Sequence, residues 1–123
     1  MLVRPVPWIS AALLAVVTPA GAQSIVSGTY DVAGTDVDGS TYTDWMRITA
    51  RSDTDCAIDW EREGKPMRTL CLISGDTLAT SFLFDNAIIL LVYRSVGYGR
   101  LEGIWKIDGE ASAGRETITL RLE

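Results

Sequence analysis

The feature that most constrains the fold is a long succession of short segments rich in Thr, Val, Ile, Tyr and Trp that begins at residue 28. None of these segments repeats its apolar residues with a helical period, so each is predicted to be a β-strand. The turns between them are too short for crossover helices, and consecutive strands are therefore expected to pair antiparallel. The eight predicted strands are Gly28 to Asp36, Thr41 to Arg51, Cys56 to Arg62, Lys65 to Ser74, Thr77 to Phe84, Ala87 to Val96, Arg100 to Ile107 and Arg115 to Leu122.

Eight strands linked by hairpins predict an all-β chain. We expect an antiparallel eight-stranded meander that closes into a small barrel of the lipocalin or avidin type. The lumen of such a barrel is either filled by side chains or holds one small ligand. An open two-sheet sandwich is the alternative fold.

The first 22 residues have the pattern of a secretory signal peptide. Arg4 precedes an apolar run, Trp8 to Val17, and the small residues Ala20-Gly21-Ala22 follow it. We therefore expect residues 1–22 to be cleaved and residues 23–123 to form a single barrel domain. The run is shorter than the roughly 20 residues of a membrane-spanning helix, which argues against a membrane anchor after cleavage. The alternative interpretation of this pattern is a buried N-terminal helix. With a signal peptide, the predicted location is periplasmic or secreted.

Composition excludes several functions. The chain has 11 Lys and Arg against 16 Asp and Glu, a formal charge of −5, so nucleic acid is not an expected partner. It has no histidine, which removes the imidazole base, the Ser-His-Asp triad and histidine-held metals. We therefore expect no enzyme, no catalytic residues and no cofactor.

A metal site is not expected either. The segment Asp36-Val37-Asp38-Gly39-Ser40 resembles the start of a calcium loop, but Thr41 stands where an EF-hand needs glycine and Arg47 where it needs glutamate. A looser cation site of Asp36, Asp38 and Asp44 is the alternative. Acidic hairpin turns are usually only solvated.

Turn chemistry predicts the register of the first hairpin. If residues 37–39 form a three-residue loop ending in a left-handed glycine, Tyr30 faces Met46 across the pair and both point into the core. Trp45 and Arg47 then point outward. An exposed tryptophan beside an arginine is typical of an interface anchor, so these two residues are a candidate surface site for a partner. A scattered surface tryptophan without a function is the simpler interpretation.

The second hairpin contains the only two cysteines. A two-residue turn at Glu63-Gly64 places Cys56 directly opposite Cys71, and export to an oxidising compartment favours a disulfide over free thiols. In this register the pair occupies a hydrogen-bonded position, where side chains lie farther apart. We therefore expect a bulge in this hairpin or a longer turn.

Two further features point to binding. Trp60 and Trp105 fall on inward positions, where they either pack the core or line a ligand-binding lumen. The segment Ile88 to Val92 is apolar on both faces. Its outer face is expected to be covered by a second copy in a homodimer, by another partner, or by a terminal segment or loop of the same chain.

Several motifs resemble a group of small exported proteobacterial β-proteins, mostly uncharacterised and some labelled fibronectin-binding. They are Gly28-Thr29-Tyr30-Asp31-Val32-Ala33-Gly34-Thr35, Asp38-Gly39-Ser40-Thr41-Tyr42, Trp60, Leu101-Glu102-Gly103-Ile104-Trp105 and Gly114-Arg115-Glu116-Thr117-Ile118. The two cysteines and Trp45 depart from the group. The Gly-Thr-Tyr opening and the later Cys-x-Ile are also similar to periplasmic metalloprotease inhibitors, exported eight-stranded barrels in which an N-terminal arm enters the protease.

The sequence thus predicts an exported, non-catalytic binding protein whose partner is an unknown protein or small molecule. It would act through the outer aromatic surface or through a small lumen. A periplasmic protease inhibitor with an arm at Gln23 to Ser27 is one alternative, and a structural or adhesin-type envelope protein is another.

Overall fold

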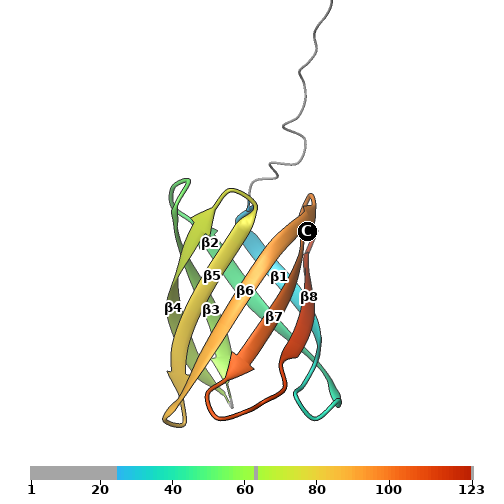
Figure 1. Ribbon diagram of the computed structural model, residues 1–123. Coiled ribbons are helices and arrows are strands. Elements are labelled where there is room, and N and C mark those ends of the chain that lie inside the picture. Colours follow the sequence, from blue (N-terminus) through green and yellow to red (C-terminus); the bar gives the residue numbers. More distant parts are fainter. Residues whose placement is uncertain (1–24, 63, 123) are drawn as a thin grey trace, which may run out of the picture.

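The computed structural model describes residues 25–62 and 64–122. Eight strands form a closed antiparallel barrel in which each strand neighbours the next and the last pairs with the first (Figure 1). This confirms the predicted barrel and excludes the open sandwich. The strands are β1 (Gly28–Thr35), β2 (Thr41–Ala50), β3 (Asp55–Arg62), β4 (Lys65–Ser74), β5 (Thr77–Phe84), β6 (Ala87–Gly97), β7 (Arg100–Ile107) and β8 (Gly114–Leu120).

The first hairpin has the predicted register. Tyr30 of β1 pairs with Met46 of β2, and both side chains are buried. The three-residue loop closes with Asp36 N donating to Ser40 O at 2.7 Å, and Gly39 takes the left-handed conformation at φ 91°. Glycine adopts this conformation without the steric cost that other residues incur.

The second hairpin confirms the disulfide and corrects the expected irregularity. Cys56 pairs directly with Cys71, with Cα atoms 5.0 Å apart and the sulfurs bonded. The pairing between β3 and β4 continues without a shift to Arg62 and Lys65. The predicted bulge or longer turn is therefore wrong, because the two Cα atoms come close enough for the bond within the regular ladder. A disulfide is consistent with an oxidising compartment.

Residues 25–27 pack against the end of the barrel at which β1 begins. Ile25 is buried in the core, and the Tyr30 hydroxyl donates to Val26 O at 2.6 Å. Ser27 Oγ accepts the Ala50 N–H at 2.9 Å. Residues 25–27 are therefore packed against the barrel and do not project from it.

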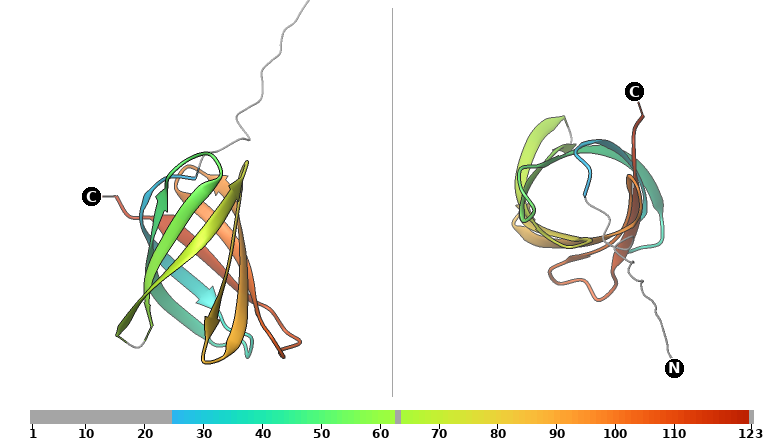
Figure 2. Two further views of the ribbon diagram at one scale, coloured as in Figure 1. Left: turned by 90° about the vertical axis from the view of Figure 1, so that its left-hand side faces the viewer. Right: turned by 90° about the horizontal axis from the view of Figure 1, so that it is seen from above.

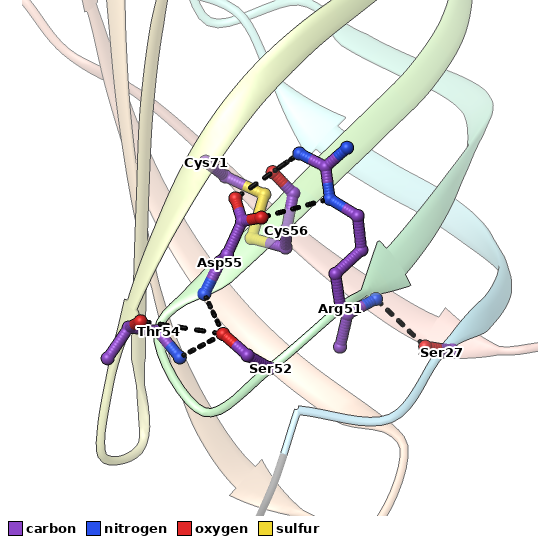
Figure 3. A network of polar contacts seen from close by, with 8 residues as sticks. Ser27, Arg51, Ser52, Thr54, Asp55, Cys56 and Cys71 are labelled. Atoms are coloured by element: carbon purple, nitrogen blue, oxygen red, sulfur yellow. Dashed lines mark hydrogen bonds and ion pairs between the residues drawn. A yellow bond between two sulfur atoms is a disulfide. The ribbon is translucent and has the colours of Figure 1, made fainter.

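A polar network fixes the β2–β3 turn at the same end (Figure 3). The Arg51 guanidinium forms an ion pair with Asp55 at 3.1 Å and donates to the Cys56 carbonyl at 3.5 Å. Ser52 Oγ accepts the Thr54 and Asp55 N–H groups. The network holds the turn beside the disulfide, which joins β3 to β4.

The opposite end is looser because two ladders stop early. β2 and β3 pair only from Arg47↔Asp59 to Ala50↔Cys56, and β4 and β5 pair only between residues 71–74 and 77–80. The tip of the β3–β4 hairpin therefore has no ladder partner on either side, and it projects from the barrel wall in both views of Figure 2.

The outer face of β6 remains exposed in the described part of the chain. Ile88, Leu90 and Val92 are 51%, 52% and 38% exposed, so no described segment covers them. This contradicts the prediction that a loop within that part covers the face. Among the described residues no helix is long and apolar enough to cross a membrane.

Candidate ligand-binding site

A transverse row of five residues crosses the inside of the barrel wall. Neighbouring positions on β2, β1, β8, β7 and β6 are occupied by Tyr42, Gly34, Glu116, Gly103 and Tyr93. The Tyr42 hydroxyl donates to Glu116 Oε1 at 2.6 Å, and the Tyr93 hydroxyl donates to Oε2 of the same carboxylate. Each tyrosine thus reaches across a glycine to the acid on β8.

The glycines of this row leave space for the rings. A Cβ on Gly34 would stand 2.8 Å from Tyr42 Cε1, and one on Gly103 would stand 2.5 Å from Tyr93 Cε1. Real Cβ atoms essentially never lie that close to another heavy atom. Glycine inside a strand often marks such a close approach. The two glycines of the row therefore leave the room that the two tyrosine rings need to reach Glu116.

Trp105 extends the row toward the projecting hairpin end. Its Nε1 donates to the Tyr42 hydroxyl oxygen at 2.9 Å, and its ring stands edge-on to that of Tyr42, with centroids 6.4 Å apart. Gly114, directly opposite on β8, again leaves the space for the indole. Trp105, Tyr42 and Glu116 thus form one hydrogen-bonded chain.

Burial and the neighbouring carboxylate keep Tyr42 protonated. Burial raises the pKa of its hydroxyl first, and the hydrogen bond and charge of Glu116 raise this pKa further above its ordinary range. The charge of Asp36 adds to the same effect. Tyr42 is therefore a fixed hydrogen-bond donor and not a group that exchanges its proton near neutral pH.

A cavity of about 200 Å³ lies beside this chain of hydrogen bonds. Its lining combines aromatic, aliphatic and acidic residues from β1, β2, β3, β5, β6, β7 and β8. The aromatic members are Tyr42, Trp45, Trp60, Phe82 and Trp105. The acidic members are Asp36, Asp44 and Glu116.

Trp60 is the member of this lining with an unmet hydrogen-bonding requirement. Its side chain is buried, with 8% of the residue exposed, and its ring packs edge-on against Phe82 with centroids 4.9 Å apart. Its Nε1 is the one buried side-chain nitrogen or oxygen in the described residues that has no hydrogen-bond partner. A buried donor without an acceptor costs about 1–3 kcal/mol.

The structure brings together residues that the sequence had placed in two separate sites. Trp60 and Trp105 point inward as predicted, and both line the cavity. Trp45 is outward and 37% exposed, as the register predicts, but it also contributes to the same lining. Arg47 is exposed and donates to Thr29 Oγ1 at 2.7 Å without lining the cavity. Trp45 is thus associated with the lumen tryptophans, and Arg47 lies apart from them.

Sequence reasoning missed Glu116, Tyr42 and Phe82. Glu116 is buried, with 8% of the residue exposed, although acids are usually solvated. A signal was available, because Glu116 shares its parity, and therefore its inward face, with the apolar Ile118 of the same strand.

A larger groove of about 700 Å³ is also present, along β1, β2, β7 and β8. Thr35, Glu102 and Arg115 are among the residues that line it. The groove is more open than the cavity, and within the described residues it has no unpartnered buried polar atom. The smaller cavity is therefore the better candidate site.

Within the described ranges, no group of three or more His, Cys, Asp or Glu side chains is placed to hold a metal ion.

The fold and the cavity define a small closed antiparallel β-barrel with an aromatic, acidic pocket at one end. No protein-family model matches the chain, and no curated protein matches it. Among solved structures, the chain is similar to a redesigned beta barrel, with a TM-score of 0.63 and 19% sequence identity. The match covers 87% of this chain and all of the other. At this identity the likeness shows the fold alone.

Proposed function

We propose that the chain is an exported, non-catalytic binding protein that takes one small ligand into the cavity beside Trp60. The observation that carries this proposal is the buried Trp60 Nε1, which has no acceptor among the described residues. The nitrogen is closed off in this structure, so a small turn of the Trp60 ring would be needed to bring it to the cavity, where a ligand oxygen would supply the missing hydrogen bond. The phenylalanine and aliphatic residues of the lining would cover the apolar part of the ligand.

The volume of the cavity suits a ligand slightly larger than benzene. A cavity of about 150 Å³ is enough for benzene, and the cavity here measures about 200 Å³. Drug-sized ligands occupy pockets of roughly 300–1,000 Å³. The expected ligand is therefore a small molecule with an apolar body and one oxygen acceptor.

Export is proposed on two grounds. Residues 1–22 have the signal-peptide pattern, and the Cys56–Cys71 disulfide suits an oxidising periplasmic or extracellular location. The resemblance to small exported proteobacterial β-proteins accords with this location. The protease-inhibitor alternative requires an N-terminal arm, and its described part, residues 25–27, is packed on the barrel.

Benzyl alcohol is a suitable probe because it combines one ring with one hydroxyl oxygen. We expect saturable one-to-one binding when it is titrated into the protein and followed by ¹H–¹⁵N NMR. Trp60→Phe retains an aromatic ring against Phe82 but removes the N–H donor, so binding should weaken at least fivefold.

A matched pair of variants locates the site. Ile89 is buried and lines the cavity, whereas its neighbour Leu90 points outward. Ile89→Phe should abolish binding by filling the space, and Leu90→Phe should leave it unchanged. Equal binding by Ile89→Phe and the unaltered protein would overturn the proposal.

A further inference from the structure

The charged residues that line the cavity are all acidic, which favours some ligands over others. Three carboxylates, Asp36, Asp44 and Glu116, line it together with five aromatic side chains. In the described part of the chain, no lysine or arginine contributes to this lining. An anion would be repelled by this set, and a purely apolar ligand would gain nothing from the acids.

Three acids outside the cavity are paired with arginines. Asp31, Asp55 and Asp59 each form an ion pair with an arginine, at 2.6, 3.1 and 2.8 Å. Across the described residues, no such ion pair involves Asp36, Asp44 or Glu116. The negative charge at the cavity is therefore left without an arginine or lysine partner from the described chain.

The carboxylates of the cavity already accept hydrogen bonds from the protein. Glu116 accepts both tyrosine hydroxyls, Asp36 accepts the Val37 N–H at 2.6 Å, and Asp44 accepts the Trp45 N–H at 2.8 Å. Both oxygens of Glu116 are thus engaged, and the three carboxylates together give the cavity a negative electrostatic field. A methylated ammonium has few or no N–H donors to satisfy, and it binds through such a field and through the faces of aromatic rings.

Resting on the proposed function, we propose that the ligand of the cavity is a small quaternary or methylated ammonium compound with an oxygen acceptor. The carboxylates and aromatic rings would surround the cationic nitrogen. The hydrogen bond from Trp60 Nε1, which has no acceptor in the described residues, would hold the oxygen. The two requirements are independent, because one comes from charge and ring faces and the other from a single buried donor.

Choline and 3,3-dimethylbutan-1-ol form a matched pair of probes. They have the same shape and the same hydroxyl group, and they differ in having a cationic nitrogen or a neutral carbon at the centre of the branched end. We expect choline to bind at least tenfold more tightly in calorimetric titrations at low ionic strength, the size of a cation–π contact in a desolvated site. Its affinity should fall with added NaCl, whereas that of the neutral alcohol should not.

Charge variants test the source of the preference. Asp44→Asn removes one carboxylate of the lining at an exposed position, so the fold is not at risk. It should reduce choline binding at least threefold without changing the binding of the alcohol. Glu102→Gln removes the same charge from the outer wall and is the control, for which both affinities should stay within twofold.

The outcomes separate the two proposals. Tighter or equal binding of the neutral alcohol overturns the cation preference and leaves the cavity as a ligand site. Preferential choline binding that Asp44→Asn and Ile89→Phe leave intact overturns the placement of the cation at this cavity. Binding of neither probe nor of benzyl alcohol contradicts the proposed function as well.

Discussion

Gly103→Ala is the substitution that most directly tests the transverse row. The added Cβ would stand 2.5 Å from Tyr93 Cε1, and Tyr93 is fully buried. Ordinary contacts between carbon atoms are about 3.5–4.0 Å, so the ring would have to move by roughly 1 Å. That movement would draw its hydroxyl away from Glu116.

The expected loss of stability follows from these contacts. Overpacking a core costs about 1–3 kcal/mol, and a hydrogen bond to a charged group is worth about 1.5–3 kcal/mol. Replacing glycine with alanine returns about 0.4–1 kcal/mol through the unfolded chain. The two costs do not add in full, because moving the Tyr93 ring relieves the overlap but weakens the hydrogen bond. We therefore expect the free energy of unfolding to fall by about 2–4 kcal/mol.

Urea-induced unfolding followed by tryptophan fluorescence measures this loss. The outward neighbour Glu102→Ala is the control, and its effect should stay within about 0.5 kcal/mol. In a Tyr93→Leu background the clash is absent, so adding Gly103→Ala should cost little more. A Gly103→Ala protein as stable as the unaltered one would contradict this contact between Gly103 and Tyr93, and so would losses that add in the double variant.

Three other predictions concern the disulfide, the buried tyrosines and the outer tryptophan. Cys56→Ala and Cys71→Ala should each cost about 3 kcal/mol in the same unfolding assay, with the double variant no worse, because one bond closes one 15-residue loop; additive losses would contradict this. Burial raises the pKa of Tyr30 to about 12 and raises that of Tyr42 as well. The unfolded chain releases these protons near pH 10, so the free energy of unfolding should be unaffected by these two tyrosines between about pH 7 and pH 9 and should fall as the pH rises above about 10; a flat profile from there to about pH 12 would contradict the burial. Iodide should quench Trp45, which is 37% exposed, and Trp45→Phe should remove most of the quenchable emission; an unchanged quenchable fraction would mean that Trp45 is shielded.

Much of the fold was predictable because hairpins are local. The loop at residues 37–39 fixes the pairing of Tyr30 with Met46, and the turn after Arg62 fixes that of Cys56 with Cys71. In each case the partners are joined by a short turn, and side-chain alternation along a strand then assigns the faces.

The candidate site was less predictable because its residues converge across several strands. Tyr42, Glu116 and Tyr93 meet only when β8 pairs with β1 and closes the barrel. That pairing joins the two ends of the described chain and depends on the stagger of the whole barrel. The pairing of β8 with β1 cannot be inferred from the register of any single hairpin.

The point at which the β2–β3 pairing stops was also not predictable from a single hairpin. Continuing the ladder beyond Arg47↔Asp59 would have paired Trp60 with Met46, but the structure has no such pair. The hairpin tip leaves the wall there, and Trp45 and Trp60 contribute to one cavity. The outer surface and the lumen, which the sequence separates, are thus joined at this end.

The binding site is tested most directly by a crystal structure of residues 23–123 soaked with benzyl alcohol, compared with an unsoaked crystal. We expect one probe molecule in the cavity, with its oxygen within hydrogen-bonding distance of Trp60 Nε1 and its ring against Phe82. A cavity filled by the protein's own side chains, or Trp60 Nε1 bonded to a protein acceptor with the probe elsewhere, would contradict this expectation.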